Sequence, residues 1–156
     1  MGSVHGCGER PVTIGAQRAV LLDTDVWSGL YSGSLRHHDV RAGKWEALIK
    51  GRSVAIAIQT RAEVLFGLAL RNVGQARRDS VIGQLDATTT VPINEDIVVA
   101  YAELAAACTR MGRGLHQKQH TGDRWIAATA IALGIPLLAG DGIYKGAPGL
   151  QLLSDP

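Results

Sequence analysis

Four acidic residues stand at the ends of apolar segments, although they lie far apart in the sequence. Asp23 follows the run AVLL, and Asp141 follows IPLLAG. Asp123 precedes the stretch WIAATAIAL, and Glu63 comes shortly after SVAIAI. Carboxylates that converge raise each other's pKa, so a cluster of four would need a cation to compensate its charge. Oxygen ligands without Cys or His favour Mg²⁺ or Mn²⁺, which polarise phosphoryl groups and activate water.

Short apolar runs alternate with longer helical patterns, and this alternation decides where the four acids lie. Strands are predicted at 19–23, 53–58, 88–92 and 135–139, with an edge strand at 150–153. Helices are predicted at roughly 36–50, 61–72, 74–86, 95–111 and 123–133. Asn94 has the chemistry of an N-cap, and Gly134 stands where the last helix should end.

Strands that alternate with helices are typical of a parallel sheet covered on both faces. We therefore predict an α/β fold, a three-layer sandwich with a central parallel sheet of four or five strands. In such sheets the reacting groups lie just beyond the carboxyl ends of the strands. Asp23 and Asp141 directly follow strands, and Glu63 falls in the first turn of the next helix. Asp123 opens a helix that runs back along the strand leading to Asp141, so all four acids are expected at one edge.

Each acid also has an ordinary structural explanation. Thr60 and Glu63 form a capping-box pattern before an apolar run. Asp123 fits a first-turn helix acid, while Asp23 and Asp141 fit turn formers. A non-catalytic α/β interaction module would require only these roles. Binding of Mn²⁺ with a gain in thermal stability distinguishes a true metal site from such a module.

Composition indicates a cytoplasmic globular protein. The chain has 156 residues, of which 46% are hydrophobic and 19% charged, which predicts one domain over 19–156. Residues 1–18 carry four glycines and no apolar periodicity, so a flexible leader is expected there. The two cysteines, Cys7 and Cys108, make no disulfide framework. The longest apolar tract, 125–139, is too short to span a bilayer, and no membrane association is expected.

Basic residues cluster before Asp123, although the net charge of +2 is too small to indicate nucleic acid by itself. The cluster contains Arg110, Arg113, His116, Lys118, His120 and Arg124. His116 and His120 have an i, i+4 spacing that could serve zinc, but no third ligand stands nearby. Clustered basic residues are usually solvated surface, and that alternative stays open here.

The order of the acidic motifs resembles that of the PIN-domain ribonucleases, most closely the VapC-type toxins of bacterial toxin–antitoxin pairs. In that family an apolar strand ends in the first acid, as LLDTDV does here with Asp23. The second acid is a Glu in a helix after the second strand, matched by Glu63 in IQTRAEVLFGL. GDRWIAATAIALGIPLLAGD matches the third and fourth acids with Asp123 and Asp141. The resemblance covers residues 19–153.

The resemblance implies a Mg²⁺- or Mn²⁺-dependent endoribonuclease. In it Asp23 and Asp123 would bind the main metal, and Glu63 and Asp141 would complete the acidic pocket. It also implies a homodimer and a cognate antitoxin protein that covers this pocket. The basic stretch leading to Asp123 would then hold phosphates of the RNA substrate. The residues expected to do so are Arg110, Arg113, Lys118 and Arg124.

Two positions depart from the family pattern: Asp25 replaces the more common Asn or Ser, and Ala139 replaces a Thr or Ser. LLDTDV also resembles the Asp-x-Asp motif of haloacid-dehalogenase-like phosphatases, which are the main alternative enzyme class. Against them, Trp27 and Ser28 replace the Gly-Thr expected after that motif, and Glu63 would have no role. A response-regulator receiver is disfavoured too, because TTTVP ends in no acid.

Overall fold

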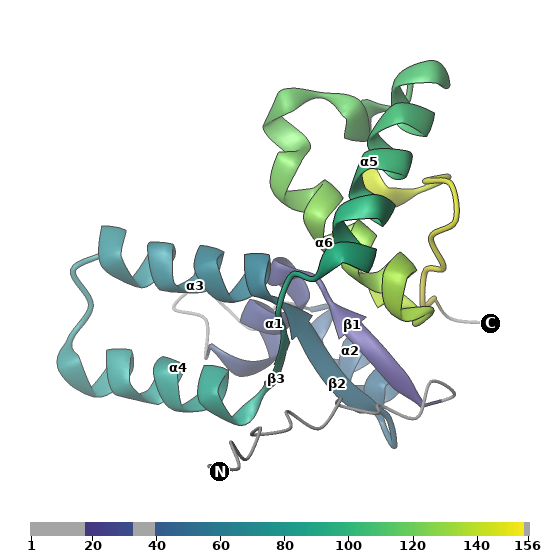
Figure 1. Ribbon diagram of the computed structural model, residues 1–156. Helices are drawn as coiled ribbons and strands as arrows, with labels where there is room; N and C mark the ends of the chain where they lie inside the picture. The colour runs from purple at the N-terminus through teal and green to yellow at the C-terminus, as the bar shows by residue number, and fades with distance from the viewer. Residues whose placement is uncertain (1–17, 33–39, 155–156) are drawn as a thin grey trace, which may run out of the picture.

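The computed structural model describes residues 18–32 and 40–154. Its centre is a parallel sheet with the strand order β3-β2-β1-β4 (Figure 1). The strands are β1 (Ala19–Leu22), β2 (Ser53–Ala57), β3 (Thr89–Val91) and β4 (Leu137–Leu138). All three strand pairings are parallel, so the carboxyl ends of the strands meet at one edge, as the sequence predicted.

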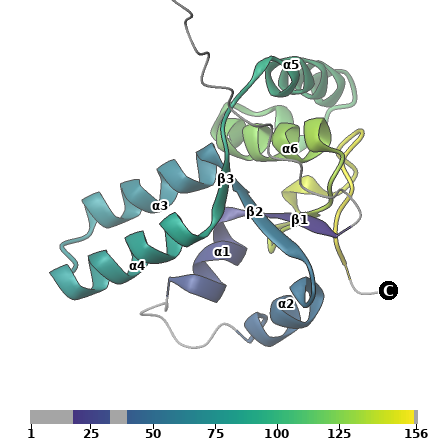
Figure 2. The same cartoon turned by 60° about the horizontal axis from the view of Figure 1, so that its bottom comes forward.

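Helices cover both faces of the sheet, which confirms the three-layer α/β sandwich. Helices α5 and α6 lie over one face, and α1 to α4 lie over the other, where α3 and α4 form a hairpin (Figure 2). The helices are α1 (Thr24–Tyr31), α2 (Ala42–Ile49), α3 (Ile58–Leu70), α4 (Gln75–Ala87), α5 (Glu95–Arg110) and α6 (Thr121–Leu133). The described residues also contain the short 3₁₀ helices η1 (Gly114–His116), η2 (Lys118–His120) and η3 (Gly142–Tyr144).

Strand β1 shows why the sequence folds in this way. Its four side chains are completely buried, because alternate residues face opposite layers. Ala19 and Leu21 pack into the core with α5 and α6, whereas Val20 and Leu22 pack into the core with α1 to α4. Burial of each large aliphatic side chain contributes roughly 1.5–3 kcal/mol to folding. The strand that ends at Asp23 is therefore held rigidly from both faces.

Two helix ends agree with the sequence chemistry. The Asn94 side chain accepts a hydrogen bond from the Ile97 backbone N–H at 3.0 Å and so caps α5. Gly134 ends α6 with φ +63°, a left-handed conformation that favours glycine.

Helix α1 was not expected from the sequence. It has only eight residues, and the segment TDVWSGLY carries no long apolar periodicity. The helix is held by tertiary contacts, because Val26 and Trp27 are fully buried in the core. Gly29 is required for this packing, since a Cβ there would lie 2.7 Å from the Trp45 ring. Tertiary packing rather than local propensity therefore forms the helix that follows Asp23.

Helix α3 begins at Ile58, three residues earlier than predicted. The prediction that Thr60 and Glu63 form a capping box is therefore wrong. Thr60 lies inside the helix and is completely buried, so it does not cap the first turn. Glu63 accordingly lies in the second turn of α3 instead of the first. This shift frees the Glu63 carboxylate from any capping role and leaves it available to a site.

The predicted edge strand at 150–153 is reduced to one parallel bridge between Leu137 and Leu152. Helix α2 begins at Ala42, later than the predicted start at 36; residues 33–39 lie outside the described part. Nearly all of the expected leader, 1–18, also lies outside it. Within residues 18–32 and 40–154, no helix is both long and apolar enough to cross a membrane.

Candidate functional site

Asp23 stands directly after β1, at the carboxyl edge of the sheet. Its backbone N–H donates to the Leu138 carbonyl at 3.0 Å, which places the residue at the boundary between β1 and β4. The residue is only 5% exposed. The hydroxyl of Tyr144, in η3, donates to Asp23 Oδ1 at 3.0 Å. The buried carboxylate of Asp23 and the buried phenol of Tyr144 therefore form a hydrogen-bonded pair at this edge of the sheet.

Asp123 reaches the same hydroxyl from helix α6, which packs in the same core as Tyr144. It lies in the first turn of α6, and its Oδ1 is 3.2 Å from the Tyr144 hydroxyl. Its other oxygen, Oδ2, is 2.7 Å from His120 Nδ1. Asp23 and Asp123 stand one hundred positions apart in the sequence, and the fold brings both to a single atom of Tyr144.

Glu63 lies beside this pair. Its Oε2 accepts a hydrogen bond from the Thr24 hydroxyl, and its Oε1 accepts one from the Gln59 amide at 2.9 Å. A Cβ on Gly122 would lie 2.7 Å from Glu63 Oε1, so the carboxylate rests against the residue preceding Asp123. The absence of a side chain at Gly122 is what permits this approach.

Asp141 occupies a different position from the other three acids. It is exposed, and its Oδ1 accepts a hydrogen bond from the Ile143 backbone N–H at 3.0 Å. None of its described contacts reaches Asp23, Glu63 or Asp123. Its side chain caps η3, the turn that carries Tyr144. The structure thus brings three predicted acids together and leaves direct participation of Asp141 as a prediction.

Burial changes the proton affinity of the central groups. The pKa of Asp23 is raised to about 7, chiefly by desolvation, with further increases from the charges of Asp25 and Asp123. Hydrogen bonds from the Thr24 backbone and the Tyr144 hydroxyl oppose the increase. The pKa of Tyr144 is also raised, first by burial and then by the two carboxylates. Tyr144 therefore remains a neutral hydrogen-bond donor at physiological pH.

The donor chemistry of this site fits a hard divalent cation. Within the described ranges no three His, Cys, Asp or Glu side chains are already arranged as a metal-binding group. Mg²⁺, however, is commonly held by one or two carboxylates and retains several waters. Asp23 and Asp123 form such a pair, and Glu63 stands next to it. These residues can hold Mg²⁺ or Mn²⁺, and nothing in their donor set would favour a softer metal.

The prediction that Arg124 contacts the RNA substrate is wrong. Arg124 was expected to bind RNA phosphates, but it is only 7% exposed. Its guanidinium donates to the carbonyls of Leu115 and Gln117 at 2.7 and 2.8 Å. It also donates to the hydroxyls of Tyr101 and Thr121. These bonds use all five N–H donors of the side chain, so Arg124 anchors η1 and η2 to α6 and has no donor left for phosphate.

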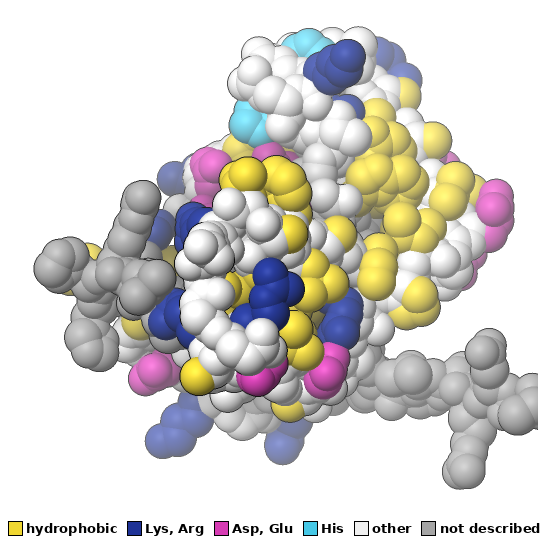
Figure 3. All heavy atoms as spheres, turned by 90° about the vertical axis from the view of Figure 1, so that its left-hand side faces the viewer, with side chains coloured by type: hydrophobic (Ala, Val, Ile, Leu, Met, Phe, Trp, Pro, Cys, Tyr) yellow, Lys and Arg dark blue, Asp and Glu magenta, His cyan; other side chains and the backbone are white. Residues whose placement is uncertain are grey.

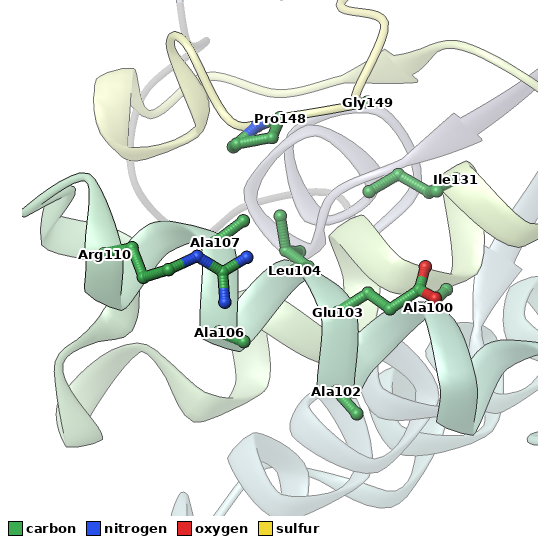
Figure 4. A pocket seen from close by; sticks show the side chains of 10 residues that line it. All are labelled: Ala100, Ala102, Glu103, Leu104, Ala106, Ala107, Arg110, Ile131, Pro148 and Gly149. Carbon is green, nitrogen blue, oxygen red and sulfur yellow. The ribbon is translucent and has the colours of Figure 1, made fainter.

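The remaining predicted RNA-binding residues fall in two places. Lys118 and Arg113 are exposed on the segment that leads through η1 and η2 into α6. Arg110 instead lines a hollow between α5 and the loop at Pro148 (Figure 4), and none of the four predicted acids is among the residues that line it. Four alanines of α5, Ala100, Ala102, Ala106 and Ala107, are among the ten residues that line it. Only the first two basic residues thus belong to the segment that carries Asp123.

The histidines do not form a pair. The His116 ring bonds to the Arg113 carbonyl, whereas His120 bonds to Asp123. The two residues lie in separate 3₁₀ turns, so the helical i, i+4 geometry on which a zinc pair depends is absent.

Sequence reasoning missed the polar partners of the acids: Thr24, Gln59, His120 and Tyr144. Thr24 is adjacent to Asp23, and His120 is three residues before Asp123, so proximity in the sequence was an available signal for both. Gln59 likewise lies one helical turn before Glu63. Tyr144 offered no such signal, because it lies 121 residues after Asp23 in the sequence and approaches it only in the folded protein.

The sequence matches the family model of the PIN domain over residues 20–149. Among solved structures, it is similar to VapBC-5, a toxin–antitoxin system of Mycobacterium tuberculosis. That match has 26% identity, covers 88% of this chain and 99% of the other, and has a TM-score of 0.63. No curated protein matches the sequence.

Two further solved structures share the fold. VapBC2 from Rickettsia felis, bound to a DNA fragment from its promoter, has 20% identity and a TM-score of 0.69. FitAcB from Neisseria gonorrhoeae has 23% identity and a TM-score of 0.66. In both cases the match covers 86% of this chain and 96% of the other.

Proposed function

The chain belongs to the PIN-domain family, whose members are nucleases, and from that premise we propose that it is a metal-dependent endoribonuclease acting as a toxin. The observation that carries the proposal is the meeting of Asp23 and Asp123 at the Tyr144 hydroxyl. Two carboxylates from distant segments, one of them buried, are costly unless a cation binds them. This arrangement supports a site built for a divalent ion.

In the proposed reaction Asp23 and Asp123 would hold Mg²⁺ or Mn²⁺, and Glu63 and Asp141 would complete the acidic surroundings. The ion would supply polarisation of a phosphoryl oxygen and activation of water for attack on an RNA phosphodiester. The protein's own contribution is orientation: Tyr144 and His120 fix Asp123, and Thr24 fixes Glu63. As in the family, the products would carry a 3′-hydroxyl and a 5′-phosphate.

The RNA is proposed to approach along the segment before α6. Lys118 and Arg113 are exposed there and can contact phosphates, which provides affinity without sequence specificity. Arg110 would contribute only to a longer substrate that reaches the hollow beside α5. The cytoplasm is the corresponding proposed location.

The proposed protein partners are a second copy of the chain and a cognate antitoxin. The similar VapBC-5 structure is a toxin–antitoxin system. On this chain, exposed hydrophobic side chains form several patches interspersed with Lys and Arg (Figure 3). The large hydrophobic side chains that are exposed include Phe66 and Leu70 of α3, which are 65% and 72% exposed, and Val98 and Val99 of α5. Exposed apolar surface of this kind is typical of protein interfaces.

The haloacid-dehalogenase-like phosphatase has less support. Both acids of its Asp-x-Asp motif would have to face the reacting group, but Asp25 is exposed on α1 whereas Asp23 is buried.

Cleavage of RNA tests the proposal. We expect wild-type protein to cut RNA in Mg²⁺ or Mn²⁺, and to lose this activity in EDTA. Asp123→Asn should lower the rate by more than about 100-fold, because losing even an outer partner of a metal ligand commonly costs 10–100-fold. Asp79→Asn, which removes an exposed acid of α4 outside the site, is the matched control. Rates followed by gel electrophoresis that are unchanged in Asp123→Asn, or insensitive to EDTA, would contradict the proposal.

Gly122→Ala separates activity from stability. The added methyl group would overlap Glu63 Oε1, which must move away from the site. Because alanine is favoured over glycine in a helix by about 1 kcal/mol, we expect an equal or higher melting temperature together with slower cleavage. Gly83→Ala in α4, where a Cβ meets nothing within 4 Å, is the control for helix propensity. Unimpaired cleavage in Gly122→Ala would remove Glu63 from the proposed site.

A further inference from the structure

The hydroxyl of Tyr144 lies within hydrogen-bond distance of both central acids, Asp23 and Asp123. The Tyr144 side chain is completely buried. The turn that carries it is fixed at both sides: Asp141 accepts from the Ile143 N–H, and the Tyr144 carbonyl accepts from the Ala147 N–H at 3.1 Å. The hydroxyl is therefore held in place from the interior of the protein.

The geometry points to Tyr144 as a positioning residue that presents the carboxylates of Asp23 and Asp123 to one divalent cation. The inference rests on the proposed function and assigns a residue to it that the family motif does not contain. The hydroxyl lies 3.0 Å from one Oδ1 and 3.2 Å from the other. Each carboxylate has about four lone-pair positions, so both retain capacity for a metal after this contact.

A hydroxyl has one proton and can donate to only one carboxylate at a time. Tyr144 therefore determines where the two oxygens lie without neutralising their charge, which is left for the cation. His120 has the corresponding role at Oδ2 of Asp123, 2.7 Å away, and thereby limits rotation of that carboxylate. Outer hydrogen-bond partners of this kind orient metal ligands and tune metal affinity.

His120 bonds to Asp123 alone, and two further polar groups of the site do not contact either central acid in the described hydrogen bonds. The Thr24 hydroxyl and the Gln59 amide both bond to Glu63. Without the Tyr144 hydroxyl, Asp23 Oδ1 would lose its described side-chain partner while remaining buried beside a second carboxylate. The two acids would then separate, and the loss should appear as weaker metal binding.

The test measures Mn²⁺ affinity by calorimetry on the full chain, independently of RNA cleavage. We expect Tyr144→Phe to weaken Mn²⁺ binding by about 10- to 100-fold. Tyr31→Phe, which removes a hydroxyl from the far end of α1, should bind Mn²⁺ as wild type does. Asp23→Asn provides the reference for loss of the site. Circular dichroism in EDTA establishes that each variant is folded.

A second measurement needs no change at Tyr144. The chain has three tyrosines, so the resonances of Tyr31 and Tyr101 can be assigned from the single variants Tyr31→Phe and Tyr101→Phe, and the remaining one belongs to Tyr144. In wild-type protein labelled with 3-fluorotyrosine, the ¹⁹F resonance of Tyr144 should shift on addition of Mg²⁺ in proportion to site occupancy. A resonance that stays constant while Mg²⁺ binds would overturn the inference even if Tyr144→Phe does not fold.

The outcomes separate this inference from the proposed function. Equal or tighter Mn²⁺ binding by folded Tyr144→Phe would overturn the role of Tyr144 and leave the metal site intact. Failure of wild-type protein to bind Mn²⁺ or Mg²⁺ would overturn the proposed function itself, and the inference with it.

Discussion

Asp23→Asn is expected to stabilise the metal-free protein, and to do so by on the order of 2 kcal/mol more at pH 8 than at pH 5. The reason is the pKa of Asp23, which burial raises from 3.8 to about 7 in the folded protein. Between these values the folded state holds a proton that the unfolded chain releases. Stability contributed by this proton is present below pH 4 and is lost as the pH rises to about 7. Asparagine does not titrate and so escapes the loss.

Urea unfolding in EDTA at both pH values measures the effect. Asp79→Asn is the control, because its carboxylate is exposed on α4, is not among the charges that raise the pKa of Asp23, and an exposed substitution usually changes stability by less than about 0.5 kcal/mol. A stability difference between wild type and Asp23→Asn that is the same at pH 5 and pH 8 would show that Asp23 is ionised throughout. In saturating Mn²⁺ the order should reverse, because only wild type gains stability from binding the ion.

Arg124→Ala is expected to destabilise the protein by roughly 3 kcal/mol or more. The substitution leaves the buried carbonyl of Leu115, and the carbonyl of Gln117, without their donor. It also removes the cation that lies 5.5 Å from the Tyr101 ring centroid. The segment comprising η1 and η2 would lose its attachment to α6, and Asp123 with it.

Urea unfolding again provides the measurement, and Lys118→Ala provides the contrast. Lys118 is exposed, so its loss should leave stability nearly unchanged while weakening RNA binding. If Lys118 contacts one phosphate, the slope of log affinity against log salt should fall by about 1. An Arg124→Ala variant with wild-type stability and a reduced salt slope would restore Arg124 as a phosphate contact.

Elements with strong periodicity or clear end signals were predictable. Helix α5 has Asn94 before its first turn, and α6 has Gly134 after its last, and both ends are observed. Helix α1 and the start of α3 were not, because buried contacts of Trp27 and Thr60 outweigh local signals. The same distinction holds for the candidate site. The order of the motifs predicted that Asp23 and Asp123 lie close together, but it did not predict that Asp141 caps the turn of η3.

By itself, the sequence determined the strand–helix alternation, the resulting parallel sheet, and the edge at which Asp23 and Asp123 must lie. These follow from apolar periodicity and chain direction, which are local properties. Only the tertiary structure decided which side chains face one another there. It buried Arg124 beneath the segment where an exposed phosphate contact was expected, and it brought Tyr144 between two acids from distant segments. Such pairings depend on how layers pack, and no spacing along the chain encodes them.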